Sequence, residues 1–347
     1  MYPDDDNESS VLDLLDRQIV HGLVTDARIP FAKLGAILGV SEQTVARRYR
    51  SMRERGILHV SGLINIVPLG NTRWMLRLRS TPDKALRLGE SLAKLPDVSW
   101  VALLSTGSEV TCVSRPRSVE QRDALLLNVL PRTSQITGLM AYEMIHRFPL
   151  AEEWPRYGRY LDADQLRQLG SRPVMHDLRG REAVELSATD EAMLALLARD
   201  GRVSYARLAA ETAWSPTRVA RRMAELIAAG VLYFDLDFAI ERMGYAVRAA
   251  LWIRTRPADL DAVGRAMTRH PEVAFVSATT GPTNLVASIV CRDSAHLYRY
   301  LTERLGALDG ILDVEVTPTL RMLKQAQALM RTDRIDMVPT ATGTRTR

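Results

Sequence analysis

The chain has 347 residues, of which 46% are hydrophobic and 25% charged, and its formal net charge is +5. This composition is ordinary for globular proteins and leaves room for two or more domains, while the mild positive charge suits an anionic partner. Only two cysteines occur, the six histidines have no metal-ligand spacing, and no apolar run approaches membrane-spanning length. We therefore expect a cytoplasmic protein without a disulfide framework, a metal site or a cofactor.

Three helices are predicted near the N-terminus, after an acidic segment (1–10) that is expected to be disordered. The apolar stripe of the first helix consists of Leu12, Leu15, Ile19 and Leu23. A short helix over 31–38 follows, and a tight connection leads to a third helix that begins after the cap Ser41 and ends at Gly56. This spacing is typical of a helix-turn-helix DNA-binding domain, which we place at 11–70.

The third helix carries arginines on the faces away from its apolar stripe. Gln43 and Arg47 are the candidates for base contacts, because glutamine can pair with adenine and arginine with guanine. Arg50 projects from the same face as Arg47. Contacts to phosphates are predicted for Arg28, Arg48, Arg53 and Arg55. Ser41 and Thr44 are further candidates for DNA contacts. The alternative for each arginine is a solvated surface charge.

From residue 73 the apolar period changes from 3.6 to 2, which indicates strands. Strands are predicted at 74–80, 98–105, 109–115 and 136–146, with helices at 82–94 and 119–129. The order βαββαβ predicts a ferredoxin-like (ACT-like) sheet domain at 71–148 with its helices on one face. The bare face of such a sheet invites pairing with a second copy.

The chain then repeats itself. Ser41–Gly56 returns as Ser215–Gly230, at a shift of 174 positions (215 − 41 = 174). We therefore predict an α+β chain with a linker at 149–185, a second helix-turn-helix domain at 186–243, a second sheet domain at 244–325 and a disordered tail at 326–347. The DNA-contact candidates of the second copy are Ser215, Thr217, Arg218, Arg221 and Arg222.

The two copies differ in charge. Arg50, Arg53 and Arg55 of the first copy correspond to Ala224, Ile227 and Ala229 of the second. Since electrostatic affinity for DNA scales with the number of phosphates that are neutralised, the first copy is expected to bind more tightly. The two sheet domains of one chain could pair with each other, or like domains of two chains could pair; the sequence leaves both arrangements open, and further assembly into a homo-oligomer is expected.

The sequence resembles the Lrp/AsnC (feast/famine) family of prokaryotic transcription regulators. The resemblance is carried by LDLLDRQIVHGLVTDARIPFAKLGAILGVSEQTVARRYRSMRERGIL (12–58), by its echo at 186–232, and by the βαββαβ pattern after each. It implies that the helix-turn-helix domains bind double-stranded operator DNA and that the sheet domains oligomerise and sense a small molecule, commonly an amino acid. Because ordinary members hold one such unit, this chain resembles a fused tandem member.

In the family, the effector pocket lies between sheet domains at a glycine-containing loop. The resemblance places it here at Thr106, Gly107, Ser108 and Glu109, and at Thr280, Gly281, Thr283 and Asn284. The family often has an aspartate three residues after that glycine, where this chain has Val110 and Asn284, so the effector stays open between an amino acid and another metabolite. The alternative function is that of an architectural protein that coats DNA without a specific effector. An enzyme is not expected, because the sequence has no nucleophile-base pair or phosphate-binding loop.

Overall fold

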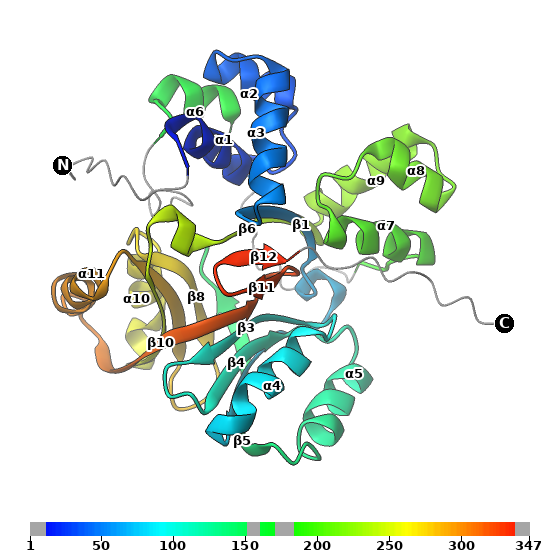
Figure 1. Cartoon of the computed structure of the whole chain (residues 1–347). Coiled ribbons are helices and arrows are strands. Elements are labelled where there is room, and N and C mark those ends of the chain that lie inside the picture. Colours follow the sequence, from blue (N-terminus) through cyan, green and yellow to red (C-terminus); the bar gives the residue numbers. More distant parts are fainter. Residues whose placement is uncertain (1–11, 151–159, 171–183, 337–347) are drawn as a thin grey trace.

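The computed structural model describes residues 12–150, 160–170 and 184–336 (Figure 1). The predicted N-terminal disorder over 1–10 lies outside these residues. Two similar halves follow each other along the chain, each with three helices, a connecting strand and a sheet domain, as the sequence predicts. The helices of the first helix-turn-helix domain are α1 (Leu14–Thr25), α2 (Phe31–Leu38) and α3 (Glu42–Glu54), and those of the second are α7 (Ala188–Arg199), α8 (Tyr205–Thr212) and α9 (Pro216–Ala228).

Local chemistry sets the bounds of α3. The Ser41 hydroxyl accepts a hydrogen bond from the Thr44 amide at 3.1 Å, which satisfies one of the free amides of the first turn. At the other end Gly56 has φ +66°, a left-handed conformation that favours glycine. The predicted apolar stripe of Val45, Tyr49 and Met52 is buried in the core of the first domain. The equivalent cap of α9 is Ser215, which accepts from the Arg218 amide at 3.2 Å.

Each sheet domain contains the predicted βαββαβ order. In the first domain the elements are β2 (Trp74–Ser80), α4 (Pro82–Ala93), β3 (Val98–Leu104), β4 (Glu109–Ser114), α5 (Val119–Asp123) extended by a π-helical turn (Ala124–Val129), and β5 (Ile136–Arg147). In the second they are β7 (Val247–Thr255), α10 (Leu260–Met267), β8 (Val273–Thr279), β9 (Leu285–Cys291), α11 (Ser294–Arg299) extended by a π-helical turn (Tyr300–Leu305), and β10 (Ile311–Lys324). Both cysteines, Cys112 and Cys291, are buried free thiols.

The two sheets of one chain join into a closed barrel. The strand order is β10-β3-β4-β2-β5-β8-β9-β7, and a further pairing of β10 with β7 closes the ring. The long strand β5 runs from its partner β2 to β8 of the other sheet, and β10 runs from β7 to β3. The question that the sequence left open is thus answered for these domains: they pair within the chain. Figure 1 shows α4 and α5 outside one sheet and α10 and α11 outside the other.

Each sheet domain inserts one side chain into the hydrophobic core of the other. Phe148, just after β5, is buried in the core of the second domain, where a Cβ on Gly264 would come within 2.3 Å of its ring. Leu323, near the end of β10, is buried in the core of the first domain, where a Cβ on Gly89 would come within 2.4 Å of its side chain. The equivalent positions of both pairs are 175 apart (323 − 148 = 264 − 89 = 175). The glycines therefore provide the space in which the two halves interlock.

The connection between helices and barrel is a two-stranded antiparallel ribbon. It consists of β1 (Leu58–Ile64) and β6 (Leu232–Phe238), the strand that follows each helix-turn-helix domain. A short helical turn follows each strand, at Val67–Leu69 and at Ile240–Met243. Both helix-turn-helix domains are thus attached to one shared element.

Part of the predicted linker belongs to the first domain. Helix α6 (Ala163–Leu169) packs on α2, and Leu169 is buried in the core of that domain. Gln165 donates its side-chain amide to the Ile37 carbonyl at 3.3 Å. Linker residues 151–159 and 171–183 lie outside the described ranges.

The predicted tail over 326–347 needs correction. Strands β11 (Leu329–Arg331) and β12 (Arg334–Asp336) form a hairpin that continues the sheet beyond β10. Its apolar residues Ala328, Met330 and Ile335 are buried, and the Ile335 amide donates to the Gly56 carbonyl at 2.8 Å. The segment is too short for its period to be visible in the sequence, and its order depends on contacts with distant elements. Residues 337–347 lie outside the described part. None of the helices within the described ranges is long and apolar enough to cross a bilayer.

Candidate functional site

The N-terminal half of α3 presents exposed polar side chains. Gln43, Arg47 and Arg50 are exposed, and neither arginine forms an ion pair with any residue in the described part of the chain. Ser41 and Thr44 stand at the same end of the helix, joined by a 2.9 Å contact between their hydroxyl oxygens. A helix that presents glutamine and arginine near its N-terminus has the arrangement needed to contact bases in the major groove.

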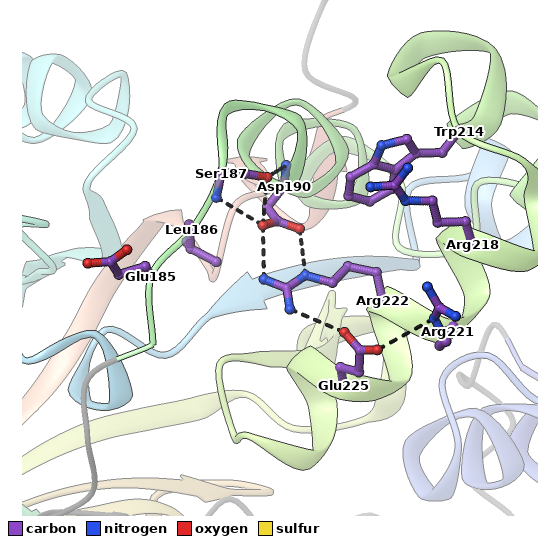
Figure 2. Close-up of a pocket in the computed structure, with 9 residues that line it drawn as sticks. All are labelled: Glu185, Leu186, Ser187, Asp190, Trp214, Arg218, Arg221, Arg222 and Glu225. Carbon is purple, nitrogen blue, oxygen red and sulfur yellow. Dashed lines mark hydrogen bonds and ion pairs between the residues drawn. The ribbon is translucent and has the colours of Figure 1, made fainter.

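On the exposed face of α9, Glu225 partly neutralises the charge of Arg221, and the Arg218 guanidinium packs on the Trp214 ring (Figure 2). Arg221 is 74% exposed and lies 3.6 Å from Glu225, one helical turn on. The Arg218 guanidinium lies over the Trp214 ring, 4.5 Å from its centroid. Ser215 and Thr217 are exposed beside them. Trp214, Arg218, Arg221 and Glu225 border a pocket of about 450 Å³ between α9 and the start of α7, which Ser187 and Asp190 also line.

Two arginines predicted to contact DNA form ion pairs within their own domains instead. Arg48 donates to Asp13 at 2.6 Å and to the buried Asp16 at 3.3 Å. Arg222 donates to the buried Asp190 at 2.8 Å. A buried carboxylate needs a charged partner, so these guanidinium groups are committed within the fold. The predicted DNA contacts of Arg48 and Arg222 are therefore corrected to structural ion pairs, which join the first and third helices in the second domain and join the third helix to Asp13 and Asp16 in the first.

Arg28 and Arg53 also differ from the prediction. Arg28 donates to the Val203 carbonyl of the second domain at 3.0 Å and to that of Gly201. Arg53 pairs with Asp200, also of the second domain, at 2.9 Å. Both side chains therefore join the two helix-turn-helix domains, and the predicted phosphate contacts are replaced by contacts within the chain. Arg55 is exposed near them.

Sequence reasoning missed Arg202, the counterpart of Arg28 at a shift of 174 positions (202 − 28 = 174). Arg202 donates to the carbonyls of Ala27 and Ile29 at 2.6 and 2.8 Å. Its guanidinium lies over the Phe31 ring at 4.2 Å, while that of Arg28 lies over the Tyr205 ring at 5.0 Å. The repeat of an arginine two residues after an aspartate was the available signal. Together the two contacts fix the orientation of one DNA-binding domain relative to the other.

Three of the residues predicted to bind an effector, Glu109, Thr280 and Asn284, form contacts within the protein. Glu109 is 4% exposed and forms an ion pair with Arg77. The Asn284 side chain bonds to the backbone of Thr255, and the Thr280 hydroxyl accepts from the Glu143 amide at 2.9 Å. The predicted role of Glu109 is corrected to that of a buried counter-ion. The other predicted loop residues are Thr106, Gly107, Ser108, Gly281 and Thr283, and none of them lines the cavity described next.

A cavity of about 260 Å³ lies inside the barrel, between the two sheets. Its walls are formed by inward-facing residues of strands from both sheet domains, including Met75, Val113, Trp252 and Val286. Four arginines and one aspartate also line it, namely Arg73, Arg115, Arg147, Arg248 and Asp235. Because the strands meet only in the closed barrel, no local sequence signal indicates this cavity.

The geometry defines a class of protein: two exposed helix-turn-helix domains held at a fixed orientation by a closed pair of sheet domains. The AsnC-type helix-turn-helix domain matches residues 12–53 and 186–227, and the Lrp/AsnC ligand binding domain matches residues 248–329. The chain belongs to the Lrp/AsnC family, with the helix-turn-helix unit present twice.

The relatives match part of this chain. An uncharacterized HTH-type transcriptional regulator of Pyrococcus abyssi, PYRAB01370, is 30% identical over 135 residues, which are 39% of this chain and 85% of the relative. The proline dehydrogenase transcriptional activator of Rhodobacter capsulatus is 26% identical over 145 residues, which are 40% of this chain and 94% of the relative. Among solved structures, the siroheme decarboxylase NirDL has a similar fold, with a TM-score of 0.59 over 92% of this chain and 94% of its own at 13% identity.

Proposed function

We propose that this protein is a transcriptional regulator that binds operator DNA through α3 and α9, with α3 contributing more of the affinity. The observation that carries the proposal is the exposure of Gln43, Arg47 and Arg50 on a capped helix, in a chain of the Lrp/AsnC family. Arg47 and Gln43 contact bases, and Arg50 contacts phosphate or base. The smaller contribution of α9 follows from Glu225, which partly neutralises Arg221.

The proposed regulation is that a small molecule, with an amino acid as one candidate, changes the affinity for the operator. Such an effector must bind one arrangement of the domains better than another, and couplings of this kind are typically about 1–3 kcal/mol. The partners we propose are therefore operator DNA in the cytoplasm and a metabolite held by the sheet domains. Further association of whole chains into a homo-oligomer is part of the proposal.

Footprinting on the DNA upstream of the gene that encodes the protein, followed by gel-shift titration, tests the proposal. We expect one discrete protected site, loss of most of the affinity in Arg47→Ala, and a smaller loss in Arg221→Ala. Arg265→Ala, which removes an exposed arginine of the second sheet domain, is the control. Coverage of DNA without sequence preference would instead support an architectural protein, and equal losses in the two variants would contradict the asymmetry.

The likeness to NirDL extends to the fold alone, and we do not propose that this chain is an enzyme. One structure of that neighbour is a co-complex with an iron-uroporphyrin III analogue. Incubation of the purified protein with siroheme, with product analysis by mass spectrometry, tests the point directly. Loss of carbon dioxide from siroheme would contradict a purely regulatory function.

A further inference from the structure

The cavity inside the barrel collects positive charge from both halves of the chain. Arg73 and Arg248 occupy equivalent positions of the repeat, 175 residues apart (248 − 73 = 175). Arg73 reaches the cavity from the position before β2, and Arg248 reaches it from β7. Arg115 follows the end of β4, and Arg147 ends β5. Asp235 on β6 is the single acidic residue among the described residues that line the cavity. Four guanidinium groups and one carboxylate therefore line the cavity.

The fold neutralises arginine elsewhere in the same barrel. Arg77 is buried and forms ion pairs with Glu109 and Glu315, one from each sheet domain. By contrast, Arg115 is 9% exposed and Arg248 half-buried, and neither forms an ion pair with a residue in the described ranges. A guanidinium removed from water without a counter-charge destabilises the fold, so the presence of Arg115 and Arg248 at one cavity favours an anion as their partner.

The remaining walls of the cavity are apolar and aromatic. Trp100 and Phe275, which occupy equivalent positions on β3 and β8, contribute to it with Trp252. The Arg147 guanidinium lies over the Phe275 ring, 5.7 Å from its centroid. Flat aromatic walls with guanidinium groups around them suit a planar apolar body with charged substituents. A volume of about 260 Å³ restricts that body to roughly one or two rings.

We propose that this cavity is the effector site and that it binds an organic acid with two or more carboxylates on a planar apolar body. This inference rests on the proposed regulatory function and specifies the site and the chemical class of its effector. Arg115 and Arg248 pair with carboxylates of the ligand, while Trp252 and Phe275 contact its body. The site differs from the two loops at Gly107 and Gly281 that the family resemblance indicated.

The cavity also contacts the elements that carry the DNA-binding domains. Tyr233, Asp235 and Leu236 on β6 line it, and so does Val24 on α1. Strand β6 pairs with β1, and these two strands connect both helix-turn-helix domains to the barrel. A ligand in the cavity therefore contacts the ribbon that sets the positions of α3 and α9. Such a contact is what a ligand needs in order to change the affinity for the operator.

Calorimetric titration of the full-length protein with a naphthalene dicarboxylate, and with the corresponding uncharged naphthalene dimethanol, tests the site. We expect binding of the dicarboxylate only, with quenching of tryptophan fluorescence. Arg115→Gln and Arg248→Gln should each weaken binding by about tenfold or more, because each removes a charged hydrogen bond. Arg248→Lys should retain most of it. Arg254→Gln is the matched control, since Arg254 lies on the same strand, is exposed and does not line the cavity.

Thermal unfolding of each variant establishes that it is folded, and gel shifts with and without the dicarboxylate show whether binding alters operator affinity. Absence of binding at millimolar dicarboxylate, or equal binding by wild type and both glutamine variants, would overturn the inference and leave the footprint, and thus the proposed function, intact. Binding that follows the predicted pattern in a protein that gives no footprint would instead support the site and overturn the regulatory function.

Discussion

Arg28 and Arg202 occupy the same position in the two halves of the chain, and each donates hydrogen bonds to two backbone carbonyls of the opposite helix-turn-helix domain. The contact is symmetric. The Arg28 guanidinium stacks on Tyr205, three residues after Arg202, and the Arg202 guanidinium stacks on Phe31, three residues after Arg28. Together with the β1–β6 ribbon, this contact holds α3 and α9 in a fixed arrangement within one chain.

If this contact positions the helices, its loss should affect two-site DNA more than one-site DNA. We expect Arg28→Ala to bind a duplex with two half-sites about tenfold more weakly, because the second domain is no longer held at a fixed distance from the first. Affinity for a duplex with one half-site should change little. Gel-shift titration of both duplexes measures this, and Arg207→Ala, an exposed arginine of the same second domain, is the control. Parallel losses on the two duplexes would show that Arg28 acts on DNA directly.

The salt dependence of binding should report which arginines meet phosphates. Arg50 is exposed and has no ion-pair partner in the described part of the chain, whereas Arg48 is held by Asp13 and Asp16. If Arg50 neutralises a phosphate, Arg50→Ala should lower the slope of log affinity against log salt by about one. Fluorescence anisotropy over a range of salt concentrations gives the slope. An unchanged slope would place Arg50 away from the DNA backbone.

Arg48→Ala provides the complementary case. It leaves the buried Asp16 carboxylate without its guanidinium partner, so it should lower the free energy of unfolding by about 3–5 kcal/mol. Denaturant unfolding followed by circular dichroism tests this, with Arg47→Ala as the neighbouring control, because Arg47 is exposed and lacks a described ion pair. Equal stability of the two variants would show that the Arg48 ion pairs are not needed by the fold.

The exchanged side chains should dominate the stability of the barrel. Phe148→Ala empties a site in the core of the opposite domain and should cost about 3–5 kcal/mol of unfolding free energy. Gly264→Ala should also destabilise, since the new methyl group meets the Phe148 ring at 2.3 Å. Equilibrium unfolding in guanidinium chloride compares them with Leu320→Ala, whose side chain is 62% exposed. A change in unfolding free energy near zero for Phe148→Ala would mean that the inserted side chain contributes little to the stability of the barrel.

Asp237 should make stability depend on pH. Burial in β6 raises its pKa from 3.8 to about 7, with repulsion from Asp235 adding to the effect, while Arg248 acts in the opposite direction. The folded protein therefore holds this proton over a range in which the unfolded chain has lost it. The stability associated with Asp237 is fully present below about pH 4 and is lost as the pH rises through about 7.

Asp237→Asn should remove this dependence. The asparagine oxygen can still accept from the Ala326 amide, which donates to the aspartate at 3.1 Å. We expect the free energy of unfolding of the variant to equal that of the wild type near pH 4. At pH 8 it should exceed that of the wild type by on the order of 4 kcal/mol. Thermal unfolding across this pH range measures the difference, with the exposed Asp261→Asn as the control. Parallel pH profiles for wild type and Asp237→Asn would rule out this role for Asp237.

The sequence by itself determined the repeat, the helix-turn-helix domains and the order of strands and helices. The apolar stripe at Val45, Tyr49 and Met52, the Ser41 cap and the Gly56 stop act over a few residues, so their consequences are visible in a short segment. The loss of charge from α3 to α9 was visible in the same way. The hairpin at β11 and β12 was missed because its strands are three residues each.

Only the tertiary structure decided where each arginine is used. Arg28, Arg48 and Arg222 carry the same charge as Arg47, yet they meet carbonyls or buried carboxylates 32 to 175 residues away. The pairing of the sheets within one chain, and hence the cavity with Arg115 and Arg248, likewise exists only once distant strands meet. Charge and period are local properties of a sequence, whereas the partner of a charge is fixed by the closure of the barrel and the contact between the two DNA-binding domains.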